Sequence, residues 1–361
     1  MKPLRIGLIG CGHIAKKHLA TIQKNKDLFQ LTDVCDTNPE QMDVVMQDYQ
    51  LNNITTHIST SSLLSNKELD VVVITTPSSL HYGMVQSALQ FKKHVIVEKP
   101  LTLNLKEVDH LIQLATLKQR EIFVCHQLRY RPIFQEIKNK IMHNAFGKIY
   151  SGVGLMRINR SSPYFEEATW RGTWQTDGGM LCNQGLHFID LLCWFMGDLA
   201  SIQGKIVNTR DWKETEDIAT AILNYRNGSI ATIYSDIVTN PSNIGYLISI
   251  TAEKGTVSIS GPNFNQLERF YLDGADLTET LAPLTTDTEE HSYMYQAIYK
   301  QLVKEDTTSS MISPTEARKS LECLFGIYQS SLLSKEQAIP MKQFATTDMT
   351  NMFIKGSERH D

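Results

Sequence analysis

The feature that most constrains the fold is a glycine-rich turn near the start of the chain. A short apolar run at residues 5–9 leads into the pattern G-x-G-x-x-A at residues 10–15, and apolar residues then recur at helical spacing. Gly10 allows a tight turn, Gly12 lets the backbone approach a pyrophosphate, and Ala15 allows a helix to pack closely on a strand. Free N–H groups at the start of that helix would bind phosphate oxygens. The pattern therefore predicts a dinucleotide site after the first strand.

Several later segments have the pattern of buried strands. Residues 70–75 read Asp-Val-Val-Val-Ile-Thr, without the polar alternation of a strand that faces water on one side. Such a run indicates burial on both faces, as in a parallel sheet. Residues 31–35, 94–97 and 122–125 behave alike, and helical patterns separate them. Repeated strand–helix units predict a doubly wound parallel sheet, and so a Rossmann dinucleotide-binding domain over residues 1–126.

The pattern changes after residue 127. We expect a helix near 131–144, a strand at 148–158 and another helix within 178–195. Further strands follow with short turns between them, at residues 201–208, 217–225, 229–238, 246–252 and 256–260. Turns such as Arg226-Asn227-Gly228 indicate hairpins and a mostly antiparallel sheet. The sequence therefore predicts a second, α/β domain over residues 127–361 for substrate binding and oligomerisation, closed by helices near 291–304 and 314–333.

Composition excludes several classes of protein. The chain has 361 residues, 42% of them hydrophobic, and a net charge of −4, which gives no electrostatic footprint for nucleic acid. No stretch approaches the roughly 18 apolar residues of a membrane span, and the N-terminus lacks the apolar region of a signal peptide. The six cysteines show no C-x-x-C spacing. We expect reduced thiols and a cytoplasmic protein without nucleic-acid or membrane partners.

An acidic residue ends the second predicted strand. Asp36 follows the glycine-rich turn by about two dozen residues, where a carboxylate can accept hydrogen bonds from the hydroxyls of an adenosine ribose. The alternative is that Asp36 only caps the loop before Asn38, where a helix is expected to begin. A 2′-phosphate would face this carboxylate, and no arginine follows within residues 37–41. NAD is therefore favoured over NADP.

Two further segments carry residues suited to chemistry. Lys99 lies between a strand end and Pro100, and ligands of open α/β sheets bind beyond the carboxyl ends of the strands, so Lys99 is expected to face a cleft. The alternative is a surface lysine. Later, Asn183, His187 and Asp190 have the i, i+4 and i+7 spacing of one helix face. A lone histidine on such a face is more often a satisfied core residue than a catalytic group.

With these segments in place, the sequence resembles the Gfo/Idh/MocA oxidoreductases, named for glucose–fructose oxidoreductase and inositol dehydrogenase. The matching residues are Gly10-Cys11-Gly12-His13-Ile14-Ala15, Asp36, Thr76-Pro77 with His81, Glu98-Lys99-Pro100, Gly178-Gly179, Gly185-x-His187-x-x-Asp190, Pro314-x-Glu316-Ala317 and Tyr328-Gln329-Ser330. The resemblance implies a Rossmann domain, a C-terminal domain with a large open sheet, and NAD(P)-dependent hydride transfer at a sugar or cyclitol carbon. It also implies a homodimer or homotetramer formed through the open sheet.

The resemblance assigns roles to two residues. Lys99 and His187 would flank the reacting hydroxyl, with imidazole as a base suited to neutral pH and the ammonium group bonded to the developing alkoxide. Many members carry aspartate four residues before the histidine, whereas this chain has Asn183. Asparagine cannot stabilise imidazolium by charge. Either Lys99 takes a larger share of the proton transfer, or Asn183 contacts the substrate.

A narrower similarity concerns the substrate. Residues 127–132, Gln-Leu-Arg-Tyr-Arg-Pro, are similar to a stretch of the bacterial UDP-N-acetyl-sugar 3-dehydrogenases, which also carry asparagine before their histidine. Arg129, Arg131 and Arg171 could bind a diphosphate through bidentate contacts. The alternative is that Arg129 and Arg131 only tie the domain boundary together. Trp170 and Arg171 are also candidates for the nicotinamide half of the cofactor.

The leading hypothesis is an NAD-dependent dehydrogenase that oxidises a sugar or nucleotide sugar, with C3 of a UDP-N-acetylhexosamine as the candidate position. The alternatives are a free-sugar or inositol dehydrogenase, an NAD-dependent glycosidase, and a non-catalytic NAD sensor that would need neither Lys99 nor His187. No metal is expected. The expected cofactor contacts are Gly10, Gly12, His13, Ile14, Asp36, Thr75, Thr76, Pro77, His81, Glu98, Lys99, Gln127, Trp170 and Arg171. The expected substrate contacts are Lys99, Arg129, Arg131, Asn183 and His187, of which Lys99, His187 and Asn183 are the catalytic candidates.

Overall fold

The computed structural model describes residues 2–304 and 311–353, and these form two compact units. The first unit comprises Met1–Thr102, Lys106–Arg131 and Asp287–Arg318. The second comprises Leu103–Leu105, Pro132–Thr286 and Lys319–Asp361. The sequence suggested a single division after residue 126, whereas a segment from near the end of the chain returns to the first unit.

The first unit is built on a parallel sheet of six strands in the order β3-β2-β1-β4-β5-β6. The strands are β1 (Leu4–Ile9), β2 (Phe29–Cys35), β3 (Thr55–His57), β4 (Val71–Ile74), β5 (His94–Val97) and β6 (Ile122–Val124). All four residues of β4 are buried, as the continuous apolar run predicted. The predicted Rossmann domain is confirmed. The strand order reverses between β1 and β4, which is where ligands bind in sheets of this kind.

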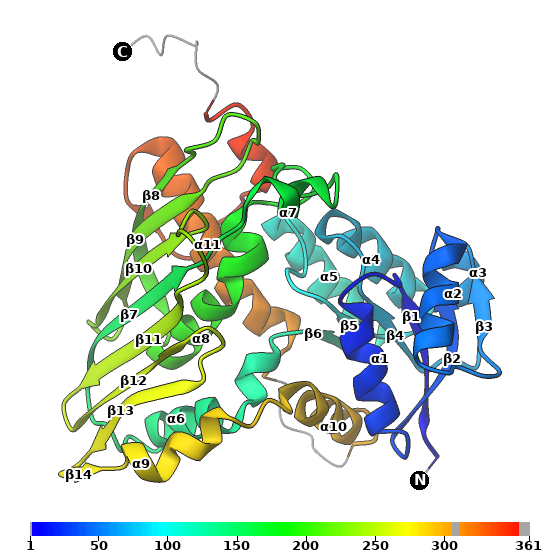
Figure 1. Ribbon diagram of the computed structural model, residues 1–361, viewed down its shortest axis with the longest axis horizontal. Coiled ribbons are helices and arrows are strands. Elements are labelled where there is room, and N and C mark those ends of the chain that lie inside the picture. The colour runs from blue at the N-terminus through cyan, green and yellow to red at the C-terminus, as the bar shows by residue number, and fades with distance from the viewer. Residues whose placement is uncertain (1, 305–310, 354–361) are drawn as a thin grey trace. The chain divides into compact units, whose positions relative to one another are not determined.

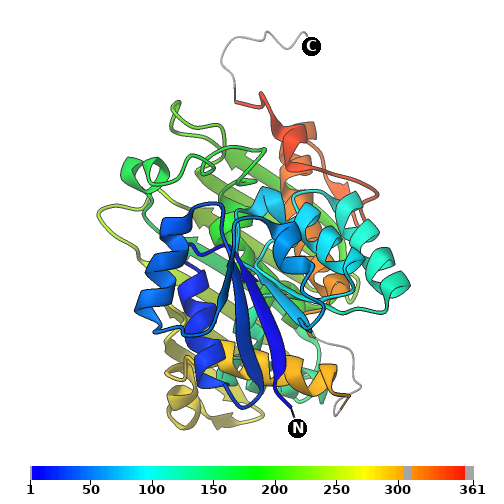
Figure 2. The ribbon, with the colours of Figure 1, turned by 90° about the vertical axis from the view of Figure 1, so that its right-hand side faces the viewer.

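Helices cover both faces of this sheet. They are α1 (Ala15–Lys24), α2 (Pro39–Asp48), α3 (Thr60–Leu64), α4 (His81–Gln90), α5 (Leu105–Lys118) and α10 (Glu290–Leu302). Figure 2 shows α1 and α2 in blue on one side of the strands and the cyan helices on the other. Asn38 caps α2 by accepting a hydrogen bond from the Glu40 N–H at 3.0 Å, as expected.

Helix α10 completes the core of the first unit. Met294, Tyr295 and Ile298 belong to the same buried cluster as Ile22 of α1 and Phe29 of β2. The Tyr295 ring lies edge-on to the Phe29 ring, with 5.4 Å between centroids. A helix predicted for the second domain therefore supplies part of the apolar interior of the first.

The second unit is built on a nine-stranded sheet in the order β14-β13-β12-β11-β7-β10-β9-β8-β15. The strands are β7 (Ile149–Arg157), β8 (Leu199–Val207), β9 (Ile218–Tyr225), β10 (Ile230–Asp236), β11 (Gly245–Ala252), β12 (Gly255–Gly261), β13 (Gln266–Leu272), β14 (Ala275–Asp276) and β15 (Gln337–Ala338). Neighbours are antiparallel except β7 and β10. The predicted large, mostly antiparallel sheet is confirmed, although the sequence did not indicate β13, β14 or β15.

Helices pack against one face of this sheet, as Figure 1 shows for α8 and α11. The helices of this unit are α6 (Pro132–Met142), α8 (Leu186–Met196) and α11 (Pro314–Leu333), with shorter helices α7 (Ser162–Glu166) and α9 (Thr278–Leu281). Short 3-10 helices lie at Ser78–Leu80, Gln127–Tyr130, Ala282–Thr285 and Thr346–Met349. A side chain at Gly154 of β7 would lie 3.0 Å from the Phe188 ring, so glycine lets α8 approach the strand.

The other face of the sheet carries exposed apolar side chains. Ile222, Ile230 and Tyr234 are each exposed by 38–50%. They alternate along their strands with buried residues, as in a sheet with one covered face. No helix in the described part of the chain is long and apolar enough to cross a membrane.

Candidate active site

The glycine-rich turn has the backbone that its sequence predicted. Gly10 has φ +93°, and a Cβ there would lie 2.9 Å from the Thr75 carbonyl oxygen, so only glycine fits without strain. A Cβ on Gly12 would meet no atom within 4 Å. Gly10 is therefore needed by the turn itself, whereas Gly12 leaves an open space beside the backbone.

The start of α1 offers uncapped donors next to this space. Ile14 is the N-cap residue, and no side chain caps the first N–H groups. Such N–H groups and the positive end of the helix dipole favour an anion. His13 is exposed and Ile14 half-buried at this turn. The turn and the helix start therefore fit a pyrophosphate.

Asp36 lies at the carboxyl end of β2 and is half-buried. Its Oδ2 accepts the Cys11 N–H at 2.7 Å, and its Oδ1 accepts the Asn38 N–H at 2.8 Å. Each carboxylate oxygen has a second lone pair, so these bonds leave capacity for ribose hydroxyls. Burial raises the pKa of the Cys11 thiol to about 12, and the charge of Asp36 adds to the rise. The carboxylate therefore both fixes the glycine turn and remains available to a ligand.

The segment after β4 is tied to the same turn. The Thr75 hydroxyl donates to the Gly10 carbonyl oxygen at 2.6 Å. His81 is buried, with Nδ1 2.7 Å from the Pro100 carbonyl oxygen and Nε2 2.9 Å from that of Thr76. Burial lowers the pKa of His81. His81 thus links the backbones after β4 and β5, and a direct cofactor contact by His81, Thr76 or Pro77 stays a prediction.

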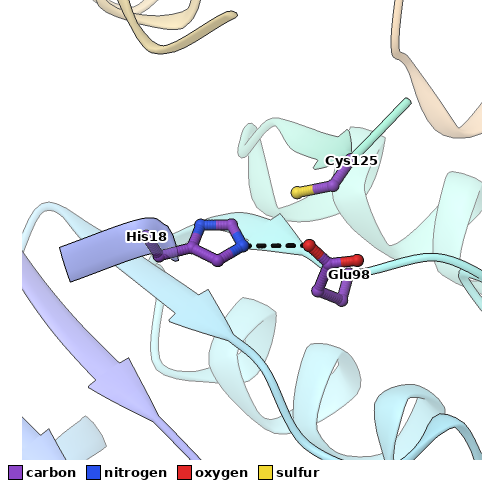
Figure 3. A group of neighbouring side chains, drawn as sticks. All are labelled: His18, Glu98 and Cys125. Carbon is purple, nitrogen blue, oxygen red and sulfur yellow. Dashed lines mark hydrogen bonds and ion pairs between the residues drawn. The ribbon is translucent and has the colours of Figure 1, made fainter. Parts of the chain in front are cut away.

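Glu98 and Lys99 follow β5 at the carboxyl edge of the sheet. Glu98 Oε1 lies 3.0 Å from His18 Nε2, and Oε2 accepts the Lys99 N–H at 3.2 Å. Figure 3 shows the hydrogen bond between His18 and Glu98. Burial by itself raises the pKa of Glu98, but the hydrogen bond from His18 and the charges around it outweigh burial and bring the pKa to about 2. The carboxylate beside Lys99 is therefore ionised at every working pH.

The two arginines after β6 have partners within the first unit. Arg129 donates to the Met311 carbonyl oxygen at 2.6 Å and to Glu316 at 3.3 Å. Arg131 donates to Glu290 at 3.0 Å. Their exposed fractions are 1% and 4%. These contacts favour the alternative that both arginines tie segments together. Gln127 lies in the preceding 3-10 helix.

In the second unit, the segment with Asn183 and His187 is not one regular helix. Residues Leu181–Gly185 form a π-helical turn, and the regular helix α8 begins only at Leu186. The regular helix expected to carry all three residues therefore begins only after Asn183, whereas His187 and Asp190 both lie in α8. Asp190 is buried, and its carboxylate accepts from the Ser320 hydroxyl at 2.5 Å. Wide turns of this kind occur frequently at functional sites.

Two residues of this segment are more exposed to solvent than the others. Within residues 177–196 every residue is buried except Asn183 and His187, which are half-buried. His187 is therefore not enclosed as a core histidine would be. Lys99 and His187 belong to different units, so their pairing around a substrate stays a prediction.

Asn183 is oriented by a buried carboxylate that the sequence did not indicate as functional. Its Nδ2 donates to Asp177 Oδ1 at 2.8 Å, and Asp177 Oδ2 accepts the Gly172 N–H at 2.9 Å. The Tyr164 hydroxyl lies 3.4 Å from the same Nδ2 and accepts from Gln184 at 2.8 Å. Because a carboxylate only accepts, the Asn183 amide must present its N–H₂ to Asp177.

A second buried carboxyl group fixes the start of the π-helical turn. Glu216 Oε1 accepts the Leu181 N–H at 2.9 Å and the Tyr328 hydroxyl at 2.6 Å. Gly179 has φ +100°, and a Cβ there would collide with Tyr328 and Glu216. Burial raises the pKa of Glu216 to about 7, although its two hydrogen bonds act the other way. The double glycine is thus explained by this close approach.

Trp170 and Arg171 lie in an aromatic cluster. The Arg171 guanidinium lies 4.0 Å from the centre of the Tyr164 ring and 5.6 Å from that of Trp170, and it pairs with Glu167 at 2.9 Å. Arg171 also lines a hollow of about 430 Å³. A larger hollow of about 550 Å³ is lined by Trp174 and residues 208–214 and 350–353, and by none of the predicted site residues.

Two family models match this chain. Residues 4–126 match the oxidoreductase family with an NAD-binding Rossmann fold, and residues 134–258 match the GFO/IDH/MocA C-terminal domain. The chain belongs to the Gfo/Idh/MocA oxidoreductase family. The open space at Gly12 and the uncapped start of α1 therefore lie in an NAD-binding domain.

Relatives of this Gfo/Idh/MocA protein include sugar and inositol dehydrogenases. The UDP-N-acetylglucosamine 3-dehydrogenase of Acidithiobacillus ferrooxidans is 27% identical over 66% of this chain and 69% of its own. The myo-inositol 2-dehydrogenase of Thermotoga maritima is 23% identical over 64% of this chain and 67% of its own. The curated relatives match this chain over about two thirds of their length.

A solved structure matches over nearly the whole chain. The WlbA dehydrogenase of Bordetella pertussis, in complex with NADH and UDP-GlcNAcA, has a TM-score of 0.87 and 28% identity over 94% of this chain and 99% of its own. The WlbA dehydrogenase of Chromobacterium violaceum, with the same ligands, has a TM-score of 0.88 and 28% identity over 94% and 97%.

Proposed function

We propose that this chain is an NAD-dependent dehydrogenase of a sugar, and that its substrate is a UDP-N-acetylhexosamine oxidised at C3. The observation that carries the catalytic part is the partial exposure of His187 and Asn183 within an otherwise buried segment. The similarity to two dehydrogenases crystallised with NADH and UDP-GlcNAcA supports the nucleotide sugar.

The residues supply complementary groups for the oxidation of an alcohol. The imidazole of His187 accepts the proton of the substrate hydroxyl, because its ordinary pKa suits neutral pH. The Lys99 ammonium donates a hydrogen bond to the oxygen on which negative charge develops. The bound nicotinamide supplies the acceptor for the hydride. Gly12 and the start of α1 bind its pyrophosphate, and Asp36 binds the adenosine ribose and disfavours a 2′-phosphate.

Asn183 takes a role that differs from that of an aspartate. Its amide N–H₂ is engaged by Asp177, so the amide oxygen is the atom that can accept from an imidazole N–H or a substrate hydroxyl. The negative charge then lies on Asp177, which is buried and fixed by the Gly172 N–H. We infer that Asn183 orients the imidazole or the substrate hydroxyl. Asp177 supplies the negative charge, which acts through its hydrogen bond with Asn183.

A free-sugar or inositol dehydrogenase is the second candidate. The burial of Arg129 and Arg131 in contacts with Glu316 and Glu290 favours it, because these arginines then do not meet a diphosphate. The inositol dehydrogenases among the relatives support the same alternative.

We also infer that the protein is a homodimer or homotetramer in the cytoplasm. Exposed apolar side chains gather on the uncovered face of the nine-stranded sheet, and such a patch marks an interaction surface. All six cysteines are buried free thiols, as suits a reducing compartment. Light scattering at micromolar concentration checks the first inference, and a strictly monomeric protein would contradict it.

The experiment that tests the function is a substrate panel with absorbance of NADH as the readout. UDP-N-acetylhexosamines, free hexoses and inositols are each supplied with NAD. We expect the nucleotide sugars to give the highest kcat/KM, with a 3-keto product by NMR. If only inositols or free hexoses are turned over, the protein is instead a free-sugar or inositol dehydrogenase. Cleavage of a glycoside without net NADH would indicate a glycosidase, and NAD binding without turnover of any kind would indicate a sensor.

A further inference from the structure

A polar cluster lies inside the first unit, beneath the carboxyl end of β5. Its members are His18 of α1, Glu98 after β5, Cys125 after β6 and Tyr295 of α10, and all four are buried. Figure 3 shows three of them. Burying such groups costs free energy unless they are hydrogen-bonded, so the pattern of their hydrogen bonds reveals what the cluster does.

The hydrogen bonds run in one direction. The Glu98 carboxylate is ionised and only accepts, so His18 Nε2 carries the proton of their 3.0 Å contact. The Tyr295 hydroxyl lies 2.7 Å from His18 Nδ1 and has no other hydrogen-bond partner among the described residues. With a neutral ring, Tyr295 donates to Nδ1 and Nε2–H donates to Glu98. Every polar side-chain atom of Tyr295, His18 and Glu98 then has a hydrogen-bond partner.

This series of hydrogen bonds ends at the backbone N–H of Lys99. Glu98 Oε2 accepts the Lys99 N–H at 3.2 Å. On the other side, the carbonyl oxygen of Pro100 lies 2.7 Å from His81 Nδ1. The Lys99 N–H is therefore held by the Glu98 side chain, which His18 of α1 contacts in turn, and the carbonyl group of the next residue, Pro100, is held by His81 of α4. These bonds fix the backbone from which the Lys99 side chain starts.

We propose that Tyr295, His18 and Glu98 form a buried hydrogen-bond chain that positions Lys99 for catalysis. Glu98 is the positioning residue, and His18 and Tyr295 act through it. The proposal rests on the proposed function, because it takes Lys99 as the group that contacts the substrate oxygen. It also gives a role to α10, which lies more than 150 residues beyond β6 in sequence.

A metal ion is the competing explanation of the cluster. The ligand atoms of His18, Glu98 and Cys125 all lie within 4.8 Å of one another, and nitrogen, oxygen and sulfur are ligands that zinc accepts. However, both ring nitrogens of His18 already lie at hydrogen-bond distance from other groups, Nδ1 from the Tyr295 hydroxyl and Nε2 from Glu98. His18 Nε2 also carries a proton toward Glu98. The donor set therefore favours a hydrogen-bond chain, and bound zinc becomes an outcome of the test.

The first experiment compares two tyrosines of α10. Tyr295 and Tyr299 lie one turn apart, and their rings pack edge-on to Phe29 at 5.4 and 5.7 Å. Tyr295→Phe removes only the hydroxyl at the head of the chain, so we expect kcat to fall about 10-fold, with unchanged KM and NADH affinity. Tyr299→Phe is the matched control and should leave all three constants unchanged. Equal kinetics in the two variants would overturn the proposal.

The second experiment distinguishes positioning from proton transfer. Glutamine at position 18 offers one donor and one acceptor but cannot carry a proton. We expect His18→Gln to keep most of the turnover and His18→Leu to lose about 100-fold, because the Glu98 carboxylate is then free to turn. Equal losses in the two variants would mean that His18 acts as a proton carrier, which contradicts a positioning role.

The third measurement does not depend on knowing the substrate. Hydrogen exchange of the Lys99 amide is followed by NMR in protein labelled with ¹⁵N-lysine and assigned with Lys99→Arg. Glu98→Gln and His18→Leu should exchange at least about fivefold faster than the wild type, His18→Gln and Tyr299→Phe. The proposed hydrogen-bond chain would be overturned if the Lys99 amide exchanged at the same rate in the wild type and all variants. Stoichiometric zinc by elemental analysis would overturn it as well. A wild type without turnover would instead overturn the proposed function and leave this measurement valid.

Discussion

Each unit buries a glutamate beside its part of the candidate site, and the two carboxyl groups behave oppositely. Glu98 faces a histidine and a lysine, and its pKa falls to about 2. Glu216 faces a tyrosine hydroxyl and one backbone N–H, its Oε2 has no hydrogen-bond partner among the described residues, and its pKa rises to about 7. Burial by itself raises the pKa of both groups, but only in Glu98 do the partners outweigh it. The comparison shows that the partners decide whether a buried carboxyl keeps its charge.

The largest effect should come from the reacting groups themselves, one in each unit. His187→Ala and Lys99→Met should each lower kcat by about 10²–10⁴-fold, the usual contribution of acid–base groups. NADH affinity, measured by fluorescence titration, should change little, because neither residue serves the pyrophosphate or the adenosine. A His187→Ala enzyme with wild-type turnover would contradict the assignment of the base.

Glu216→Gln sharpens the comparison of the two carboxyl groups. Between the ordinary pKa of 4.5 and the folded pKa of about 7, the folded protein keeps a proton that the unfolded chain releases. The free energy of unfolding therefore decreases as pH rises through this window and stays lower above it. Glutamine removes this loss, so at pH 8 the variant should be more stable by up to about 3 kcal/mol. The thermal midpoints of the wild type and of Glu216→Gln should agree near pH 4.5. If the difference between the two midpoints does not grow as pH rises, the raised pKa of Glu216 is contradicted.

The glycine turn tests how strictly the first unit depends on backbone conformation. Gly10→Ala should destabilise the protein by about 2 kcal/mol, because φ is +93° and the new Cβ lies 2.9 Å from the Thr75 oxygen. Gly12→Ala meets open space and should leave the thermal midpoint unchanged while it weakens NADH binding about 10-fold. The expectation fails if both variants are equally stable and bind NADH equally well.

Asp36→Ala concerns the choice of cofactor. Loss of the carboxylate removes a charged hydrogen-bond acceptor for the ribose and the repulsion of a 2′-phosphate. The preference for NAD over NADP, taken as the ratio of kcat/KM values, should fall about 10-fold. A wild type that uses NADP as well as NAD would show that Asp36 does not contact the ribose.

The smallest effect should come from Asn183→Asp. The new carboxylate would lie about 3 Å from that of Asp177, so one of the two groups must take a proton. We expect kcat to fall about fivefold and the exchanged pair Asn183→Asp with Asp177→Asn to restore it, since the charge then changes places. A fully active single variant would mean that Asp177 does not act on Asn183.

The sequence predicted the first unit well because backbone requirements leave local signatures. The glycine pattern at residues 10–15 and the continuous apolar run of β4 are each complete within a few consecutive residues, so a short window of sequence shows them. The strands β13, β14 and β15 were missed because β13 has a single buried residue and a register shift against β12, and the other two have two residues each. Short strands at a sheet edge lack a clear alternation.

The second part of the site depended on contacts distant in sequence. Asn183 and His187 were identified as candidates, but the π-helical turn that carries Asn183 was not predicted. The Leu181 N–H at its start donates to Glu216, a residue distant in sequence. Asp177 was visible before the double glycine, yet nothing local showed that it bonds Asn183. The placement of α10 in the first unit likewise follows from packing against Phe29, which no single window of sequence displays.

The discontinuity of the first unit also bears on how the protein is made. A ribosome completes β6 at residue 124 but must reach residue 302 before α10 is available. At roughly 5–20 residues per second, that interval lasts on the order of 10–40 seconds. Throughout it the apolar surface around Ile22 and Phe29 lacks its final cover. The nascent chain therefore leaves this apolar surface open to aggregation while strands β7 to β14 of the second unit are being synthesised.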